Sequence, residues 1–129
     1  MFDLLGIDWG TKCIGFALAN SSTKLIIPHS STNLKTFYFS LQEILGKYPI
    51  TKIVVGRPVN FQLQPTEVTT KVELFAAELQ NKLPNIGVVF VNERNSSKDG
   101  LHGLTSAKSL ASNSIHSLSA AKILEYYLG

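Results

Sequence analysis

Apolar residues alternate with other residues in two short runs within residues 4–19, and the tripeptide Gly10-Thr11-Lys12 separates the two runs. This pattern predicts a β-hairpin. A third strand is expected over residues 25–30, where Pro28 is better tolerated on the edge of a sheet. We expect the neighbouring His29 to be a surface side chain without a partner. In strand register, the two faces of the first strand carry Leu5, Ile7 and Trp9 on one side and Leu4, Gly6 and Asp8 on the other.

Three later segments repeat apolar residues at helical spacing and predict helices. The first helix is expected to start after Thr32 or Asn33 and to end at Gly46 and Pro49. The second is expected between Pro65 and Pro84, and the third from about residue 114. The predicted buried face of the second helix consists of Val68, Val72, Phe75 and Leu79. That of the third helix consists of Leu118, Ala121, Leu124 and Leu128.

Two further segments, residues 52–56 and 86–91, are apolar at consecutive positions and rich in β-branched residues. This composition is typical of strands that are buried on both faces of a parallel sheet. Residues 57–61 are expected to form a loop. Residues 95–114 sustain neither period, so we expect a short helix at most and then a mobile loop.

The order of these elements predicts an α/β fold. Three strands in a meander, followed by helix, strand, helix, strand and helix, give a mixed five-stranded sheet in which strand 2 is antiparallel. Right-handed crossovers then favour the strand order 3-2-1-4-5. Parallel strands bring their carboxyl ends to one edge, which is where open α/β sheets bind ligands.

Composition narrows the possible classes of protein. A chain of 129 residues makes one domain, residues 1–129, and its single cysteine, Cys13, excludes an intramolecular disulfide and a cysteine-rich zinc site. We expect no signal peptide, no membrane span and a cytoplasmic location. The net charge of +3 is compatible with a polyanionic partner such as a nucleic acid.

Polar residues follow three of the predicted parallel strands. Asp8 ends the first strand, Arg57 follows the fourth and Glu93 follows the fifth. The long segment before the last helix could return the start of that helix, with His116, to the same edge. Two carboxylates and an imidazole would then form a site for Mg²⁺ or Mn²⁺.

Each of these residues also has an ordinary structural interpretation. Asp8 could accept hydrogen bonds from the amides of Gly10 or Thr11 in a tight turn. Glu93 could form an exposed ion pair with Arg94. His116 could be a helix-start residue bonded to the backbone, and a solvated surface role is open for both Arg57 and Arg94.

Four blocks of sequence, residues 5–15, 53–60, 91–94 and 115–124, resemble the YqgF/RuvX family in order and spacing. Members of that family are described as Holliday-junction resolvases or as nucleases that mature the 5′ end of pre-16S ribosomal RNA. The resemblance spans essentially the whole chain. It implies an RNase H-like fold and metal-dependent hydrolysis of phosphodiester bonds in RNA or branched DNA.

The resemblance also assigns site residues. Asp8 and Glu93 match two acidic positions of the family, and His116 stands where the family usually has a third acid, so these three are the candidate catalytic and metal-binding residues. The candidate substrate-binding residues are Thr11, Lys12, Arg57, Asn60 and Arg94. As a protein acting on pre-rRNA or branched DNA, the chain is expected to be a monomer or a homodimer.

The sequence departs from the family pattern at several places. Asn92 replaces the usual Asp before the Glu-Arg pair, residues 61–63 lack the usual Asp-Gly, and residues 112–114 lack the usual basic residues. An assembly factor that binds nucleic acid through a degenerate site is therefore one alternative function. A phosphotransferase is another, because Gly6-Ile7-Asp8-Trp9-Gly10-Thr11 also resembles the phosphate loop of sugar kinases.

Overall fold

The computed structural model describes residues 1–59, 66–94 and 115–129, and for residues 58, 59, 93 and 94 it describes the backbone alone. The described part forms five strands and three helices. The strands are β1 (Leu4–Asp8), β2 (Ile14–Ala19), β3 (Ile26–Thr32), β4 (Lys52–Val59) and β5 (Gly87–Arg94). The helices are α1 (Phe37–Lys47), α2 (Glu67–Lys82) and α5 (Ile115–Leu128).

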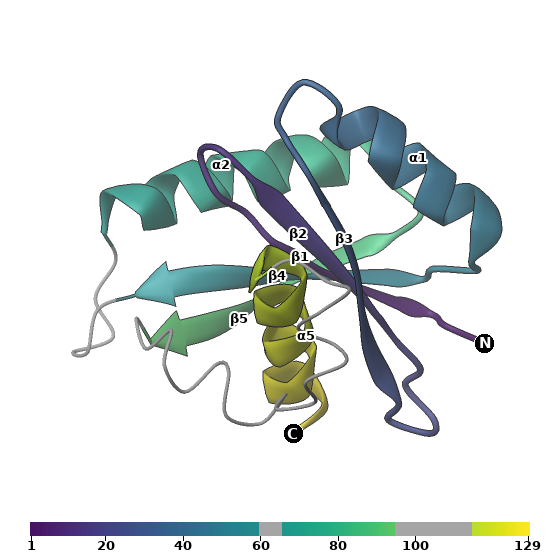
Figure 1. Cartoon of the computed structure of the whole chain (residues 1–129). Helices are drawn as coiled ribbons and strands as arrows, with labels where there is room; N and C mark the ends of the chain where they lie inside the picture. The colour runs from purple at the N-terminus through teal and green to yellow at the C-terminus, as the bar shows by residue number, and fades with distance from the viewer. Residues whose placement is uncertain (60–65, 95–114) are drawn as a thin grey trace.

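The strands form one mixed sheet in the order β3-β2-β1-β4-β5, which confirms the predicted topology. Strand β2 is antiparallel to both β1 and β3, whereas β4 is parallel to β1 and to β5. Helices α1 and α2 cover one face of the sheet, and α5 lies across the other face (Figure 1).

Each face of the sheet has its own apolar core, as the alternation of β1 predicts. On the face covered by α1 and α2, Leu5 and Ile7 pack with Phe16, Phe37 and other buried residues. On the α5 face the buried residues are mostly small or aliphatic: Leu4, Ala17, Ala19, Val54, Ala120, Ala121, Ile123 and Leu124. The small side chains let α5 lie close to the strands.

Two glycines make that close approach possible. A Cβ on Gly6 would lie 2.7 Å from Leu124 Cγ and 2.8 Å from the carbonyl oxygen of Ala120. A Cβ on Gly15 would lie only 2.0 Å from the carbonyl oxygen of His116. Helix α5 therefore rests directly on the backbone of the hairpin, and its first turn lies over β2.

The two parallel strands after the hairpin differ from the prediction. The expected loop at residues 57–61 was wrong in its first part, because β4 continues to Val59 and pairs with β5 as far as Arg94. Proline is tolerated at position 58 because β1 has already ended at Asp8, so β4 has only one neighbour there. Strand β5 is not fully buried as expected, because it is an edge strand, and Phe90 is exposed.

Helix boundaries also shifted by a few residues. Helix α1 begins at Phe37, and Asn33 accepts the backbone N–H of Thr36 just before it. Gly46 lies within α1 rather than ending it, and the extended backbone of Tyr48, which the following proline favours, stops the helix. In α2, Val68 is exposed and Thr69 is buried in its place.

Strand β3 lies on the edge of the sheet, as Pro28 predicts, but the expectation for His29 was wrong. A bulge inserts one extra residue in β3, because Ala17 pairs with Pro28 whereas Phe16 pairs with Ser30. His29 is half-buried, its Nδ1 lies 2.8 Å from the Ser30 hydroxyl, and its ring stands edge-on to Tyr48. The extra residue turns the imidazole toward the end of α1.

Replacing Gly15 with alanine should destabilise the protein, because the added methyl group collides with the backbone of α5. We expect Gly15→Ala to lower the free energy of unfolding by about 1–3 kcal/mol, the usual range for overpacking. Gly46→Ala is the matched control: no atom lies within 4 Å of its Cβ position, and alanine inside a helix should add about 0.5–1 kcal/mol. Urea unfolding of both variants measures the difference. Equal free energies of unfolding for the two variants would contradict the close packing of α5 against Gly15.

Candidate active site

Asp8 lies at the carboxyl end of β1, largely buried beneath the start of α5. Its cross-strand partner is Gly15, the residue on which α5 rests. Among the described residues, none donates a hydrogen bond to the Asp8 carboxylate, and none forms an ion pair with it. Burial raises the pKa of the Asp8 carboxyl from its ordinary value of 3.8 to about 6, and the nearby His116 ring partly opposes the rise.

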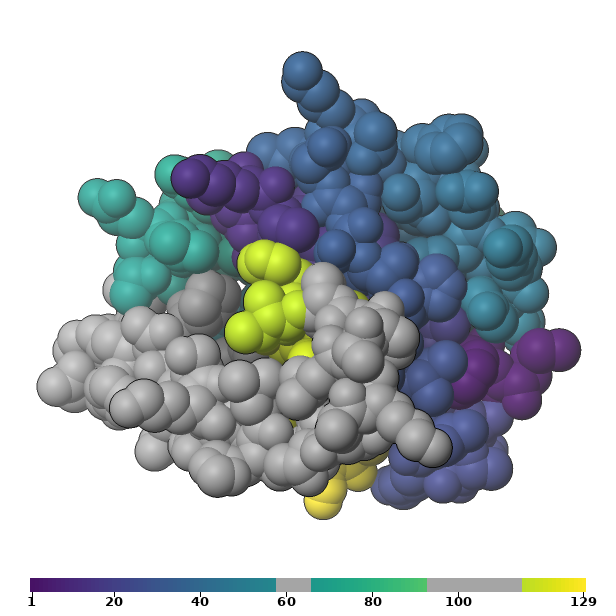
Figure 2. All heavy atoms as spheres, viewed as in Figure 1, coloured from purple at the N-terminus to yellow at the C-terminus, as the bar shows by residue number. Residues whose placement is uncertain are grey.

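His116 reaches this edge because it lies in the first turn of α5. The first turn of α5 lies at the surface beside the β1–β2 loop (Figure 2). The His116 backbone lies against Gly15, and its ring is close enough to Asp8 to influence the charge of that carboxyl. The structure therefore brings together the first and last of the three predicted site residues.

The third predicted residue, Glu93, belongs to the end of β5. Its backbone pairs with position 58 of β4, beyond the point where β1 ends. Strands β1, β4 and β5 are parallel neighbours, so their carboxyl ends lie along one edge of the sheet. The backbone of Glu93 is thus at the edge that carries Asp8, and its side chain lies outside the described part of the structure.

The turn interpretation of Asp8 does not match the structure. No hydrogen bond joins the Asp8 carboxylate to the amides of Gly10 or Thr11, both of which are described. A carboxylate that is desolvated without local hydrogen bonds is costly, and such groups are enriched at functional sites. The position of Asp8 therefore favours a functional role over a turn-forming one.

The predicted substrate contacts are placed unevenly. Thr11 and Lys12 are exposed in the β1–β2 loop next to Asp8. The backbone of Arg94 ends β5 at the same edge. Asn60 lies outside the described residues.

Arg57 has partners that the sequence did not reveal. Its Nε donates to Glu73 of α2 at 3.0 Å, and its Nη1 donates to the Asn92 side chain of β5 at 3.0 Å. The guanidinium therefore links β4, α2 and β5 immediately before Glu93. Asn92 takes part as a hydrogen-bond acceptor. In the sequence, only its position next to Glu93 and Arg94 pointed to such a role.

The donor set suits a hard divalent cation. A carboxylate with no partner among the described residues, a neighbouring imidazole and a second acid at the same edge of the sheet are the ligand types that Mg²⁺ and Mn²⁺ accept. Within residues whose side chains are described, no group of three such ligands lies together. Completing a site at Asp8 and His116 therefore depends on Glu93.

A family model described as RuvX, Holliday junction resolvase, matches residues 3–129. This chain belongs to the RuvX family. Curated RuvX-like relatives carry the name "Putative pre-16S rRNA nuclease". The protein from Mycoplasma mobile is 35% identical over 72% of this chain and 67% of its own length. The protein from Prosthecochloris aestuarii is 28% identical over 97% of this chain and 92% of its own length.

Solved structures support the fold expected for a RuvX-family chain. RuvC from Thermus thermophilus, solved in complex with a Holliday junction substrate, superposes with a TM-score of 0.58. The alignment covers 98% of this chain and 94% of that chain at 17% identity. The likeness confirms the RNase H-like fold. Among the described residues, no helix is both long and apolar enough to cross a membrane.

The buried Asp8 carboxylate predicts a stability difference that depends on pH. The pKa of the Asp8 carboxyl is higher in the folded protein than in the unfolded chain. The protonated carboxyl therefore contributes stability below about pH 4, and this contribution is lost as pH rises through 6. Without divalent metal, Asp8→Asn should therefore be more stable than wild type by about 2–3 kcal/mol at pH 8 and nearly equal to it at pH 4. Denaturant unfolding in EDTA at the two pH values tests this expectation.

Asp3→Asn is the control for that comparison. The Ser21 hydroxyl and amide donate to Asp3 and lower the pKa of its carboxyl, so this variant should lose stability at pH 8. If Asp8→Asn also lost stability at pH 8, the Asp8 carboxylate would have a protein partner that compensates for its burial.

Proposed function

We propose that this protein is a metal-dependent endonuclease that hydrolyses phosphodiester bonds during 5′-end maturation of pre-16S rRNA. The observation that carries the proposal is the desolvated Asp8 carboxylate, without a described hydrogen-bond partner, next to His116. Membership of the RuvX family and the names of the curated relatives support the reaction class and the substrate. A pre-rRNA substrate would place the protein in the cytoplasm, acting as a monomer or a homodimer.

Asp8, Glu93 and His116 would hold the metal. When bound, one or two Mg²⁺ or Mn²⁺ ions supply a hydroxide nucleophile and neutralise charge on the scissile phosphate. Asp8 provides a carboxylate already stripped of water, so less solvent must be displaced on binding. The imidazole of His116, in the first turn of α5, would supply a nitrogen ligand beside Asp8.

The remaining polar residues at this edge would position the substrate. Thr11 and Lys12 can contact backbone phosphates, which gives affinity without sequence preference. Asn60 and Arg94 are assigned the same role. Arg57 would act differently, because its guanidinium is already bonded to Glu73 and Asn92 and therefore orders the end of β5, the strand that contains Glu93.

The second candidate is cleavage of branched DNA, which the description of the matching family favours. A binding role without hydrolysis is the third, because Asn92 and His116 depart from the acidic pattern of the family. Direct comparison of substrates separates the three functions.

Cleavage should require Asp8. With Mn²⁺, wild type should cut a 5′-extended 16S rRNA precursor, and Asp8→Asn should reduce the rate by at least about 100-fold if the ligand is lost. A four-way DNA junction is assayed in parallel, and faster cleavage of the junction would favour the resolvase alternative. Binding without cleavage by either protein would favour the assembly factor.

The identity of the third ligand should set the preferred metal. His116→Asp creates an all-oxygen ligand set, which should increase activity with Mg²⁺ relative to Mn²⁺. The ratio of the two rates is measured for wild type and variant at equal metal concentrations. An unchanged ratio would show that His116 is not a ligand.

A further inference from the structure

The carboxyl ends of β4 and β5 extend past their neighbour β1. Strand β1 pairs with β4 only as far as the pair formed by Ile7 and Val55, whereas β4 and β5 stay paired up to Val59 and Arg94. Among the described strands, this last part of β4 therefore has β5 as its single neighbour. A two-stranded piece of sheet is only marginally stable by itself. The candidate ligand Glu93 belongs to this piece, so its position depends on what else holds the two strand ends together.

Arg57 bridges the two-stranded piece. It pairs with Asn92 across the two strands, and its Nη1 donates to the Asn92 side chain at 3.0 Å. Its Nε donates to Glu73 of α2, also at 3.0 Å, and the two charges form an ion pair. The guanidinium is planar and presents its donors in a rigid fork, so an acceptor that holds one donor also fixes the direction of the other. Glu73 therefore determines how Arg57 holds β5.

This bridge and the candidate metal site lie on opposite faces of the sheet. Ile53 and Val55, which share a face with position 57 in strand register, belong to the core under α1 and α2. Position 92 is on that face too, because its side chain meets Arg57. In strand register, position 93 then belongs to the α5 face, which is the face of Asp8. Glu73 can therefore influence the metal site only through the backbone of β5.

The exposure of the ion pair indicates a local role. The side chain of Arg57 is 24% exposed and that of Glu73 is 43% exposed. Ion pairs that are this accessible to water contribute little to the free energy of unfolding. Metal binding is more demanding, because the ligands must meet at fixed distances, and groups that orient ligands change metal affinity by about 10–100-fold. The same contact can thus matter little for folding and much for metal binding.

We propose that Glu73 is a positioning residue for the metal site. Through Arg57 and Asn92 it holds the end of β5, and with it the backbone of Glu93, in place beside Asp8. Loss of the Glu73 carboxylate loosens the ends of β4 and β5 and lowers the affinity for the metal without unfolding the chain. This inference rests on the proposed nuclease function, because it assigns a residue to the same metal site.

Amide hydrogen exchange tests the hold on β5 without metal. Glu73→Met removes the charge and the acceptor and keeps a good helix former. In EDTA, we expect amides within residues 56–59 and 91–94 to exchange several-fold faster in this variant, as measured by NMR. Amides within residues 53–55 and 88–90 should exchange as in wild type. An equal acceleration of both sets, or no change in either, would overturn the proposal.

Metal affinity is the second measurement, and Trp9 reports it. Trp9 is the only tryptophan of the chain and directly follows Asp8. Mn²⁺ is paramagnetic and quenches the fluorescence of a nearby indole, so a titration gives the dissociation constant without substrate. Glu73→Met should weaken Mn²⁺ binding by about 3–10-fold, which is less than the loss of a direct partner of a ligand. Its urea midpoint should stay close to that of wild type. An unchanged dissociation constant would overturn the proposal.

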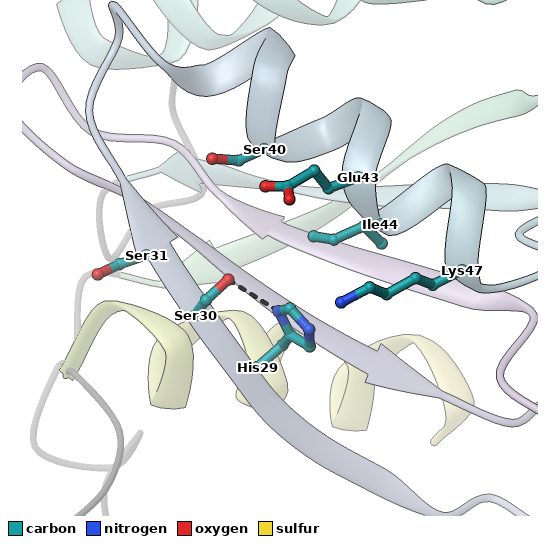
Figure 3. Close-up of a pocket in the computed structure, with 7 residues that line it drawn as sticks. All are labelled: His29, Ser30, Ser31, Ser40, Glu43, Ile44 and Lys47. Carbon is teal, nitrogen blue, oxygen red and sulfur yellow. Dashed lines mark hydrogen bonds between the residues drawn. The ribbon is translucent and has the colours of Figure 1, made fainter.

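Two other helical glutamates provide matched controls. Glu78 of α2 forms an ion pair with Lys82 at 3.6 Å, so Glu78→Met removes a charge and an ion pair from the same helix. Glu43 of α1 lines a cavity beside β3, at the edge of the sheet opposite β5, and has no ion-pair partner among the described residues (Figure 3). Glu43→Met thus removes a charge alone. Both controls should bind Mn²⁺ as wild type does, and weakening equal to that of Glu73→Met would overturn the positioning role.

Two variants of the bridge separate geometry from charge. Arg57→Lys keeps the positive charge and loses the fork, so it should weaken Mn²⁺ binding as Glu73→Met does. Asn92→Asp places an anionic acceptor for Arg57 on β5 itself. In that background Glu73→Met should change the dissociation constant by less than about twofold, because the two acceptors share one partner. An undiminished effect of Glu73→Met there would overturn the proposal.

Failure of the nuclease function has a different signature. If wild type did not bind Mn²⁺ and cleaved no substrate, the metal-dependent mechanism would be wrong. The exchange measurement in EDTA would still decide whether Glu73 holds the end of β5. Metal binding in wild type with the same affinity in Glu73→Met would instead contradict the positioning role and leave the nuclease function intact.

Discussion

The packing of α5 directly against the β1–β2 hairpin is the contact on which the candidate active site depends. Gly6 and Gly15 have no side chains, so the helix backbone meets the strands directly. That contact removes water from Asp8 and brings His116 beside it. The desolvated carboxylate costs stability in the metal-free protein, as expected for a group that is retained for binding rather than for folding.

The two faces of the sheet bury side chains of different size. The face under α1 and α2 contains the larger side chains, among them Phe16 and Phe37, and forms the larger apolar core. The α5 face is built mostly from small and aliphatic residues and includes Asp8. The larger apolar core on one face therefore supports a sheet that carries a desolvated carboxylate on the other.

Arg57 joins three elements of the fold next to Glu93. The residue before Glu93 is Asn92, and its side-chain oxygen accepts a hydrogen bond from Arg57. Glu73 supplies the negative charge that the asparagine lacks. The guanidinium thus links β4, α2 and β5 with one charged and one neutral acceptor.

Hydrophobic periodicity and right-handed crossovers are local and topological constraints, so the order and type of the elements and the strand order could be predicted from the residues alone. The sequence also identified Asp8 and His116 as candidates, since both adjoin predicted element ends. Three features could not be predicted in this way: β4 continues through position 58, β5 is partly exposed, and Arg57 is bonded to Glu73. Each depends on which elements lie beside a strand at a given point, and only the folded chain shows that. The partial burial of His29 could not be predicted either. It follows from the bulge in β3, which becomes visible only when β3 is paired with β2.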